Sequence, residues 1–305
     1  MSKTLLVTGA FGFIGRNVAK HFANAGWTVV GIGHGSWTRK EWRQWGISDW
    51  HTTDVTPDAL LTYAGSPEAV IHCAGSGSVG FSMTHPLQDF QRTVMTTIAV
   101  MEFVRLHAPQ AHVVLPSSAG VYGVVETLPI AESAPLVPVS PYGVHKKLSE
   151  EICKSYADHF GVTVTVLRLF SVYGAGLEKQ LLWDACNKIT RGEYTFFGSG
   201  NELRDWIHVS DVASLMEHVI VHSSEKYSVY NGATGLGVSV ADILKLLFTG
   251  LGVSSLPSFS GISKPGDPAG YVADIGKANN ALNWKPVVSW QNKIAAYAEW
   301  FRKTI

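Results

Sequence analysis

A tyrosine and a lysine four residues apart are the first side chains in this sequence that could carry chemistry. Tyr142 and Lys146 lie in the stretch SPYGVHKKLSEE, in which Ser140 and Pro141 are typical of a helix start. A spacing of four residues places both side chains on one helix face. A phenol with a pKa of about 10 is a poor acid–base at neutral pH, but a nearby cation stabilises the phenolate and lowers that pKa. The pair is therefore either two exposed surface residues without a role in catalysis, or a proton-transferring tyrosine and a lysine that lowers its pKa.

A pair of serines precedes this stretch by a little more than twenty residues. The sequence HVVLPSSAGVYG is an apolar run that ends in Ser117 and Ser118. If the run is a strand of a parallel sheet, its hydroxyls lie at the carboxyl edge, where such sheets bind ligands. Ser118 is thus a candidate partner for the reacting group.

A glycine-rich loop near the N-terminus predicts a dinucleotide site. TGAFGFIG, residues 8–15, follows an apolar run and opens a helical pattern, which is the context that makes such a motif informative. Its first glycine permits a tight turn, its second lets the backbone approach a pyrophosphate, and its third allows close packing of helix and strand. The free N–H groups of the helix start then bind the phosphates. The expected cofactor contacts in this loop are Gly9, Phe11, Gly12, Phe13, Ile14 and Gly15.

The second apolar run ends without the acidic residue that holds the ribose hydroxyls in NAD-selective enzymes. Gly33 occupies that position in GIGHGSWTRK. A 2′-phosphate would not be repelled there, and basic or hydroxyl side chains could accept it. NADP(H) is therefore favoured, with NAD(H) possible. The candidate phosphate contacts are His34, Ser36, Arg39 and Lys40, and Asp54 and Val55 after the third strand are expected at the adenine end.

The elements that position these residues form the pattern of a doubly wound α/β fold. Five runs are apolar throughout rather than alternating, as is typical of parallel strands covered on both faces: residues 5–9, 27–33, 69–75, 112–118 and 162–170. Helix-like segments separate them, which predicts a Rossmann-type sheet in residues 1–170. The later segments GSGNELRDW, TGLGVSV and SKPGDPAGY read as long loops, so residues 171–305 are expected to form mainly a smaller α/β substrate domain, with about 206–232 returning to the first.

One predicted helix, from about residue 87 to residue 107, is apolar on nearly every side between Val94 and Val104. A surface helix has a single apolar stripe, so this helix is expected to be covered twice. We expect the sheet to supply one cover and a partner subunit the other, which predicts a homodimer.

Composition excludes several classes of function. The 24 basic residues equal the 24 acidic ones, so no global charge favours nucleic acid or an anionic membrane. The three cysteines and twelve histidines show no metal-ligand spacing, and no metal is expected. No apolar run approaches the ~18 residues of a membrane span, and no signal peptide is apparent, which predicts a cytoplasmic protein without a membrane role.

Taken together, the motifs resemble the extended short-chain dehydrogenase/reductase family, in particular the NAD-dependent epimerase/dehydratase group that acts on nucleotide sugars. TGAFGFIG is similar to its cofactor loop, IHCAG to its fourth-strand end, SSAGVYG to its serine motif and PYGVHK to its tyrosine–lysine motif. LRLFSVYG and GSGNELRDWIHVSDVA resemble its substrate loops, and DIGKANNALNWKP its C-terminal signature. The resemblance covers essentially the whole chain.

The resemblance implies a role for each residue of the motifs. Ser118 would hydrogen-bond the reacting sugar oxygen, Tyr142 would exchange its proton, and Lys146 would bind the nicotinamide ribose and lower the pKa of the tyrosine. Arg204 would pair with the diphosphate of a nucleotide-diphosphate sugar, for which a guanidinium fork is well suited. Further cofactor contacts are expected from Cys73, Ala74 and Phe170, and further substrate contacts from Ser76, Ser171, Gln180, Phe197 and Lys264.

Three departures limit what the resemblance implies. Thr93 stands where the family has the asparagine that supports a water relay, Ser171 replaces the frequent asparagine of its substrate loop, and Lys264 replaces a late arginine. Each substitution changes a polar contact. The late lysine cannot form a bidentate fork.

The resemblance leaves three reactions to consider: dehydration, 4-ketoreduction and 4-epimerisation of a nucleotide sugar. Dehydratases place an acid pair directly after the serine, and Ala119 and Gly120 at those positions can neither remove a proton nor expel water. A 4-ketoreductase and a 4-epimerase remain, and the missing ribose acid favours the NADPH-dependent reductase, with the NAD-dependent epimerase as the alternative. A non-catalytic dinucleotide sensor is the alternative outside enzymology, although a sensor has no need of a tuned phenol.

Overall fold

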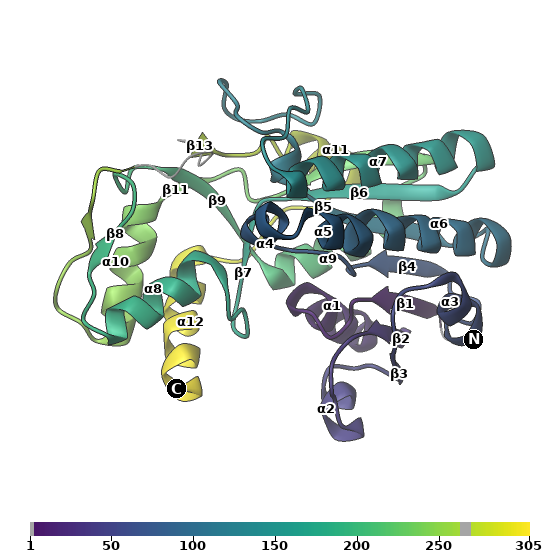
Figure 1. Ribbon diagram of the computed structural model, residues 1–305, viewed down its shortest axis with the longest axis horizontal. Helices are drawn as coiled ribbons and strands as arrows, with labels where there is room; N and C mark the ends of the chain where they lie inside the picture. The colour runs from purple at the N-terminus through teal and green to yellow at the C-terminus, as the bar shows by residue number, and fades with distance from the viewer. Residues whose placement is uncertain (1–2, 263–269) are drawn as a thin grey trace.

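A seven-stranded parallel sheet forms the larger part of the protein in the computed structural model, which describes residues 3–262 and 270–305 (Figure 1). Its order is β10-β6-β5-β4-β1-β2-β3. Most of these strands are apolar and buried on both faces, as helices on both sides of a parallel sheet require. The doubly wound fold predicted from the sequence is confirmed. The strands are β1 (Thr4–Thr8), β2 (Thr28–Gly33), β3 (Asp49–Thr52), β4 (Ala69–His72), β5 (His112–Ser118), β6 (Thr163–Leu169) and β10 (Tyr227–Gly232).

Helices cover the sheet in two layers, each with its own apolar core. One core includes residues of α1, α9 and α11, and the other includes residues of α3, α6 and α7. Figure 1 shows α6 and α7 side by side along the sheet. The bounds are α1 (Phe13–Asn24), α2 (Arg39–Gln44), α3 (Pro57–Tyr63), α6 (Thr96–His107), α7 (Pro141–Phe160), α9 (Val209–His222) and α11 (Gly276–Leu282).

The apolar helix expected over residues 87–107 is a composite of three segments. It consists of α5 (Pro86–Phe90), a π-helical turn η1 (Gln91–Met95) and α6. The hydroxyls of Thr96 and Thr97 donate to the carbonyls of Arg92 and Thr93, each at 2.7 Å, so side chains satisfy acceptors of the widened turn.

The second cover of this helix lies within the chain. Val100, Phe103 and Val104 are buried in a core shared with α3 and α7. The apolar character of the helix therefore does not require a partner subunit, contrary to the reasoning from sequence. Met95 and Leu106 stay about half exposed, and the homodimer stays a prediction.

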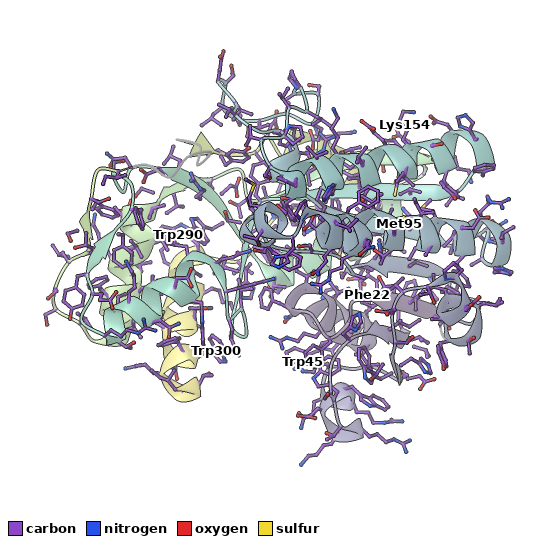
Figure 2. All side chains as sticks on the ribbon, in the orientation of Figure 1. Phe22, Trp45, Met95, Lys154, Trp290 and Trp300 are labelled. Atoms are coloured by element: carbon purple, nitrogen blue, oxygen red, sulfur yellow. The ribbon has the colours of Figure 1, made fainter. Side chains whose placement is uncertain are left out.

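A smaller part of the molecule, at the left of Figure 1, carries the C-terminal helix. Its sheet has the order β11-β9-β13 with β7 beside β9, and β12 pairs with β8. Tryptophans on α12 pack against its core: Figure 2 shows Trp290 and Trp300 on that helix, and the ring of Trp300 lies 5.9 Å from that of Trp183 on α8. The elements are β7 (Ser171–Tyr173), β8 (Thr195–Phe196), β9 (Leu203–His208), β11 (Gly237–Ser239), β12 (Ser258–Phe259), β13 (Gly270–Tyr271), α8 (Gln180–Thr190), α10 (Val240–Leu251) and α12 (Trp290–Thr304).

The chain passes between the two parts more than once. β10 pairs with β6 in the large sheet, and α9 packs on α1. Ala278, Leu282 and Trp284 also enter the core between α1 and α9, although they lie in the region assigned from sequence mainly to the substrate domain. The three segments read as loops from sequence each contain strand residues, namely those of β9, β11 and β13. β9 pairs with β11, β13 and β7.

Two kinds of feature are missing from the described part of the chain. Across residues 3–262 and 270–305, no helix is both long and apolar enough to cross a membrane. The same residues contain no group of three or more histidine, cysteine or acidic side chains that could hold a metal ion.

Candidate active site

The end of β5 and the start of α7 bring Ser118 and Tyr142 together. Ser118 is the last residue of β5, and its hydroxyl accepts a hydrogen bond of 3.1 Å from the backbone N–H of Gly120, the middle residue of the short 3₁₀ helix η2 (Ala119–Val121). Tyr142 is the second residue of α7, and its side chain hydrogen-bonds that of Ser118. The two residues singled out from sequence are therefore in direct contact.

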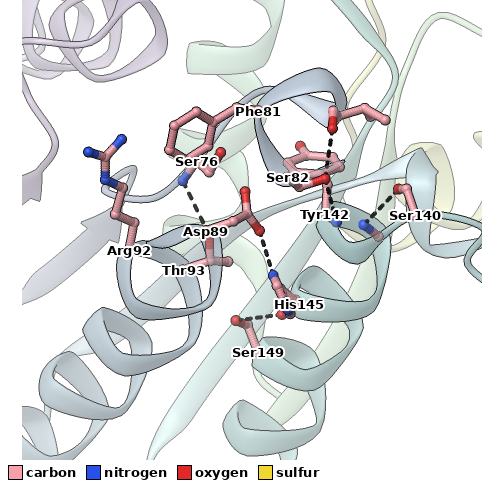
Figure 3. Close-up of polar contacts among 12 residues, drawn as sticks. Ser76, Phe81, Ser82, Asp89, Arg92, Thr93, Ser140, Tyr142, His145 and Ser149 are labelled. Carbon is pink, nitrogen blue, oxygen red and sulfur yellow. Dashed lines mark hydrogen bonds and ion pairs between the residues drawn. The ribbon is translucent and has the colours of Figure 1, made fainter. Parts of the chain in front are cut away.

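Two glycines allow α7 to approach η2 this closely. A Cβ on Gly143 would lie 2.5 Å from the carbonyl oxygen of Gly120, a distance that backbone atoms do not tolerate. A Cβ on Gly120 would in turn lie 3.4 Å from the Ser118 hydroxyl. The helix start is fixed from two further sides, since the Ser140 hydroxyl accepts from Gly143 N at 3.2 Å and the Ser82 hydroxyl accepts from Tyr142 N at 3.0 Å (Figure 3). Ser82 belongs to α4 (Val79–Thr84).

Lys146 lies one helical turn further on and is buried, with 8% of its surface exposed. Its Nζ donates to the carbonyl of Pro116 in β5 at 3.0 Å. Burial lowers the pKa of Lys146, while the nearby Cys73, Asp89 and Glu150 raise it. The hydrogen bond to Pro116 thus fixes the ammonium of Lys146 near the carboxyl end of β5. Lys146 and Tyr142 lie on the same helix, α7.

The phenol of Tyr142 is held in its protonated form by its surroundings. Burial raises the pKa of Tyr142, the hydrogen bond with Ser118 lowers it, and the carboxylate of Asp89 raises it. Burial therefore opposes the phenolate that proton abstraction needs. A cationic ring bound beside Tyr142 would supply the missing stabilisation.

The glycine-rich loop has the shape of a dinucleotide cradle. Gly9 has φ +67°, and a Cβ there would lie 2.6 Å from Ala74 N. A Cβ on Gly15 would lie 2.4 Å from the carbonyl of Gly9, so α1 packs directly on the turn. Gly12 is the N-cap of α1, and Phe13 and Ile14 are the first two residues of the helix. No side chain caps the N–H groups of this first turn. These donors are oriented to bind a pyrophosphate, so the residues present fit the dinucleotide.

The adenosine end differs from the expectation in one contact. His34 and Asp54, predicted to bind different parts of the cofactor, pair with each other at 2.7 Å, and both side chains are largely exposed. The carboxylate beside His34 disfavours a 2′-phosphate at that position. Arg39 lies exposed at the first position of α2, and Val55 packs against the core below the sheet edge.

The remaining predicted contacts fall into two groups. Cys73, Ala74 and Ser76 follow β4 at the carboxyl edge, and Phe170 is buried directly after β6. The others belong to the smaller part of the molecule: Ser171 begins β7, Gln180 begins α8 with φ +67°, Phe197 is 57% exposed, and Arg204 lies on β9 with Nη1 donating to Leu203 O at 2.8 Å. Lys264 lies outside the described residues.

Thr93, which stands in place of the expected asparagine, has a structural contact of its own. It lies in the π-helical turn, and its hydroxyl accepts from Ser76 N at 3.2 Å (Figure 3). Thr93 therefore ties the loop after β4 to the turn.

Reasoning from sequence missed three residues near the site. Asp89 and His145 form a buried pair beneath Tyr142, and the ammonium of Lys179 lies 3.1 Å from the place where a Cβ on Gly77 would be. His145 could have been found, because it lies three residues after Tyr142 and next to Lys146. No sequence pattern connects Asp89 or Lys179 to the motifs.

Comparisons with known proteins agree with this geometry. The family model "NAD dependent epimerase/dehydratase family" matches residues 5–233. The chain is 31% identical to "UDP-glucose 4-epimerase 4" of Oryza sativa, over 93% of this chain and 86% of the relative. A solved UDP-glucose 4-epimerase of Thermotoga maritima with UDP-glucose superposes with a TM-score of 0.87 at 27% identity, over 99% of both chains. A UDP-glucuronic acid 4-epimerase of Bacillus cereus with UDP-glucuronic acid and NAD gives 0.85 at 25% identity, over 99% of this chain and 100% of that one.

The comparisons also bear on the cofactor and on the class of protein. The matching family is NAD-dependent, and the Bacillus cereus structure holds NAD. The expected preference for NADP(H) has no support in these findings. The absence of an acid at the ribose means only that a 2′-phosphate is not repelled there; it does not supply a group that binds the phosphate. Fold, motif order and relatives agree that this chain is an enzyme of the extended short-chain dehydrogenase/reductase type, and it belongs to the NAD-dependent epimerase/dehydratase family.

Proposed function

We propose that this protein is an NAD-dependent 4-epimerase of a nucleotide-diphosphate sugar, with a UDP-hexose as the substrate class. The observation that carries the proposal is the Ser118–Tyr142 contact above Lys146, with Ala119 and Gly120 in place of an acid pair. That arrangement can move one proton at one sugar oxygen. It has no carboxylates directly after Ser118 for the elimination of water, and the relatives named above are UDP-sugar 4-epimerases.

The chain's own residues would divide the work as follows. Tyr142, as phenolate, takes the proton of the sugar 4-hydroxyl and later returns one, while the Ser118 hydroxyl donates a hydrogen bond to the same sugar oxygen. Lys146 binds the nicotinamide ribose and stabilises the phenolate by its charge. Bound NAD, held by the glycine-rich loop and Lys146, would supply the reversible hydride-transfer chemistry at C4.

Epimerisation sets a further requirement on binding. The intermediate keto-sugar must present both of its faces to one hydride, so the diphosphate must be held more firmly than the ring. Arg204 on β9 is our candidate for that anchor, because a guanidinium matches the geometry of phosphate oxygens. Binding energy at the diphosphate then leaves the sugar free to turn.

The sequence favoured an NADPH-dependent reductase because no acidic residue ends β2, where Gly33 lies. Two observations weigh against it: His34, a candidate contact of a 2′-phosphate, is paired with the carboxylate of Asp54, and the family is NAD-dependent. The epimerase alternative therefore takes its place as the proposal.

Analysis of the cofactor separates the two reactions. Cofactor released from the purified protein by denaturation is identified by mass, and the protein is then incubated with UDP-glucose without added nucleotide. We expect NAD in the released fraction and formation of UDP-galactose. Released NADP, together with stoichiometric oxidation of NADPH by a 4-keto-sugar and no epimer, would show that the enzyme is a reductase.

A further inference from the structure

One face of α7 holds the end of β5 in place. α7 packs against β5 and β6 (Figure 1), and Tyr142, Lys146 and Glu150 lie along one of its faces because they follow one another at intervals of four residues. Lys146 Nζ donates to the carbonyl of Pro116 at 3.0 Å, and the Ser117 hydroxyl donates to Glu150 Oε1 at 2.5 Å. Two successive residues of β5 are thus bound by α7 directly before the strand ends.

Ser118 is the next residue of the strand, and it borders Tyr142. A Cβ on Gly120 would lie 3.4 Å from Ser118 Oγ and 3.6 Å from Tyr142 Cε1, so both side chains adjoin the same position. Ser117 precedes Ser118 directly in the chain. A shift of the Ser117 backbone would therefore move Ser118 relative to Tyr142.

The proposed chemistry gives Glu150 no role, although its carboxylate joins three elements. Glu150 is buried, with 3% of its surface exposed. Besides Ser117 on β5 it binds Arg168 on β6, whose Nη2 and Nε lie 2.8 Å and 3.1 Å from Oε2. Ser117 and Arg168 are register partners in the sheet. The carboxylate thus joins α7 to two neighbouring strands at one level of the sheet.

Arg168 is held from its other side. Its Nη1 donates to the Tyr122 hydroxyl at 3.2 Å and to the carbonyl of Glu132 at 2.9 Å, and the Tyr122 hydroxyl donates to Asn231 Oδ1 at 2.7 Å. A buried ion pair often adds little stability compared with apolar side chains of the same size, because removing both charges from water is costly. What these contacts do supply is a fixed position for the Glu150 carboxylate.

We propose that Glu150, fixed by Arg168, is a positioning residue that holds the Ser117 hydroxyl and thereby sets Ser118 against Tyr142. The inference rests on the proposed use of Ser118 and Tyr142 at one sugar oxygen. Glu150 acts through Ser117, the covalent neighbour of Ser118. Its contribution is geometric, because a displacement of about 1 Å at reacting groups can cost as much as 10²-fold in rate.

Removal of one hydroxyl tests this role with little disturbance of the core. Ser117→Ala deletes the hydrogen bond between β5 and α7 and leaves the Glu150–Arg168 pair in place. We expect kcat for UDP-glucose to fall about tenfold and KM to stay within about twofold of wild type, because the loss concerns alignment rather than binding.

Ser228→Ala is the matched control. It also removes a buried serine hydroxyl from the same sheet, on β10, where the hydroxyl lies 2.9 Å from that of Thr165. We expect a similar shift of its denaturant midpoint and a wild-type kcat. Equal kcat values for Ser117→Ala and Ser228→Ala overturn the inference.

Two substitutions of Glu150 separate the hydrogen bond from the charge. Glu150→Gln and Glu150→Met both leave the charge of Arg168 unbalanced, so both should lower the denaturant midpoint. Only the amide can still hydrogen-bond the Ser117 hydroxyl. We expect the Gln variant to turn over about tenfold faster than the Met variant, a difference that a merely structural ion pair would not produce.

Equal kcat values for the two Glu150 variants also overturn the inference. If these variants do not fold, the comparison of Ser117→Ala with Ser228→Ala decides alone. Bound NAD, measured for every variant, verifies that the dinucleotide site is intact.

Failure of the inference and failure of the proposed function give different results. A wild-type protein that epimerises UDP-glucose, with an unchanged kcat in Ser117→Ala, refutes the positioning role alone. A wild-type protein that forms no epimer but reduces a 4-keto-sugar with NADPH refutes the proposed reaction alone. The same variants are then compared in that reduction, because it would use Ser118 and Tyr142 at the same sugar oxygen.

Discussion

Tyr142 lies in surroundings that favour the phenol over the phenolate. Burial and the Asp89 carboxylate raise its pKa, and only the Ser118 hydrogen bond lowers it within the described contacts of the phenol. A base must lose its proton before it can accept one, so the rate of the oxidative half-reaction should increase as pH rises through the pKa of Tyr142. The positive nicotinamide ring of a bound NAD⁺ would lower that pKa and so move the increase to lower pH.

Replacement of this single oxygen tests the role of Tyr142. Tyr142→Phe should reduce kcat by about 10²–10⁴-fold, as loss of an acid–base group does, and should leave NAD binding unchanged. Epimerisation rate and bound NAD are the measurements. Tyr63→Phe, which removes the phenol oxygen of a half-exposed residue on α3, is the matched control and should behave as wild type. Wild-type turnover in Tyr142→Phe would exclude Tyr142 as the base.

Arg204 permits a second test at the residue scale. Burial raises the pKa of Tyr271 on β13 and the positive charge of Arg204 opposes that rise, so the guanidinium acts close to that strand. Arg204→Ala should raise KM for UDP-glucose at least tenfold and lower kcat far less, because a diphosphate anchor serves mainly binding. Arg191→Ala, at the exposed end of α8, is the control. An unchanged KM in Arg204→Ala would remove the residue from the substrate site.

Among single residues, those in local motifs were predictable and those joined only by the fold were not. Ser118, Tyr142, Lys146 and the loop glycines lie where spacing and strand ends place them. Asp89 meets His145 across 56 positions of sequence, on a short helix with no motif of its own. Only the packing of α5 on α7 brings that pair together.

At the scale of elements, the contact between α7 and η2 sets the position of Tyr142. Gly143→Ala would insert a methyl group 2.5 Å from the Gly120 carbonyl, so the start of α7 must shift. We expect kcat to fall at least tenfold, since a displacement of about 1 Å can cost as much as 10²-fold in rate. Val144→Ala, on the exposed side of the same turn, controls for a general effect on the helix. Equal kcat values for the two variants would show that the close approach does not position Tyr142.

The elements themselves were predicted unevenly, for physical reasons. Buried parallel strands such as β1 and β5 are apolar throughout, so sequence locates them to within a residue or two. β9, with its LRDWIH sequence, owes its strand conformation to pairing with β7, β11 and β13 rather than to local propensity. The π-helical turn depends on threonine hydroxyls that satisfy its carbonyls, which no periodicity reveals.

The molecule as a whole buries histidines that can be protonated only with difficulty. Burial lowers the pKa of His112 to about 4. Burial, together with the positive charge of Lys146, lowers the pKa of His72 to about 3. In the unfolded chain histidine has a pKa of about 6.5. The unfolded state therefore binds more protons as pH falls below about 6.5, and the stability of the fold decreases from there toward pH 4 and below.

His112→Gln should reduce this dependence on pH. The amide can keep the 2.9 Å contact with Thr165 and does not titrate. The unfolded chain then binds one proton fewer, and each such proton changes the free energy of unfolding by at most about 1.4 kcal/mol per pH unit. Denaturant unfolding at pH 7.5 and at pH 5 measures the loss of stability between them. The loss should be smaller in His112→Gln than in wild type, and the exposed His107→Gln should match wild type. Equal losses in all three proteins would contradict the account of His112.

Across the whole molecule, the central claim is that one hydride leaves C4 of the sugar and returns to it. UDP-glucose labelled with deuterium at C4 tests this directly when it is incubated with the purified protein without added nucleotide. We expect UDP-galactose that retains the deuterium at C4, because a cofactor that stays bound between the two transfers would return the same label to the sugar. UDP-galactose that has lost the label, or no UDP-galactose while NADPH reduces a 4-keto-sugar, would contradict it.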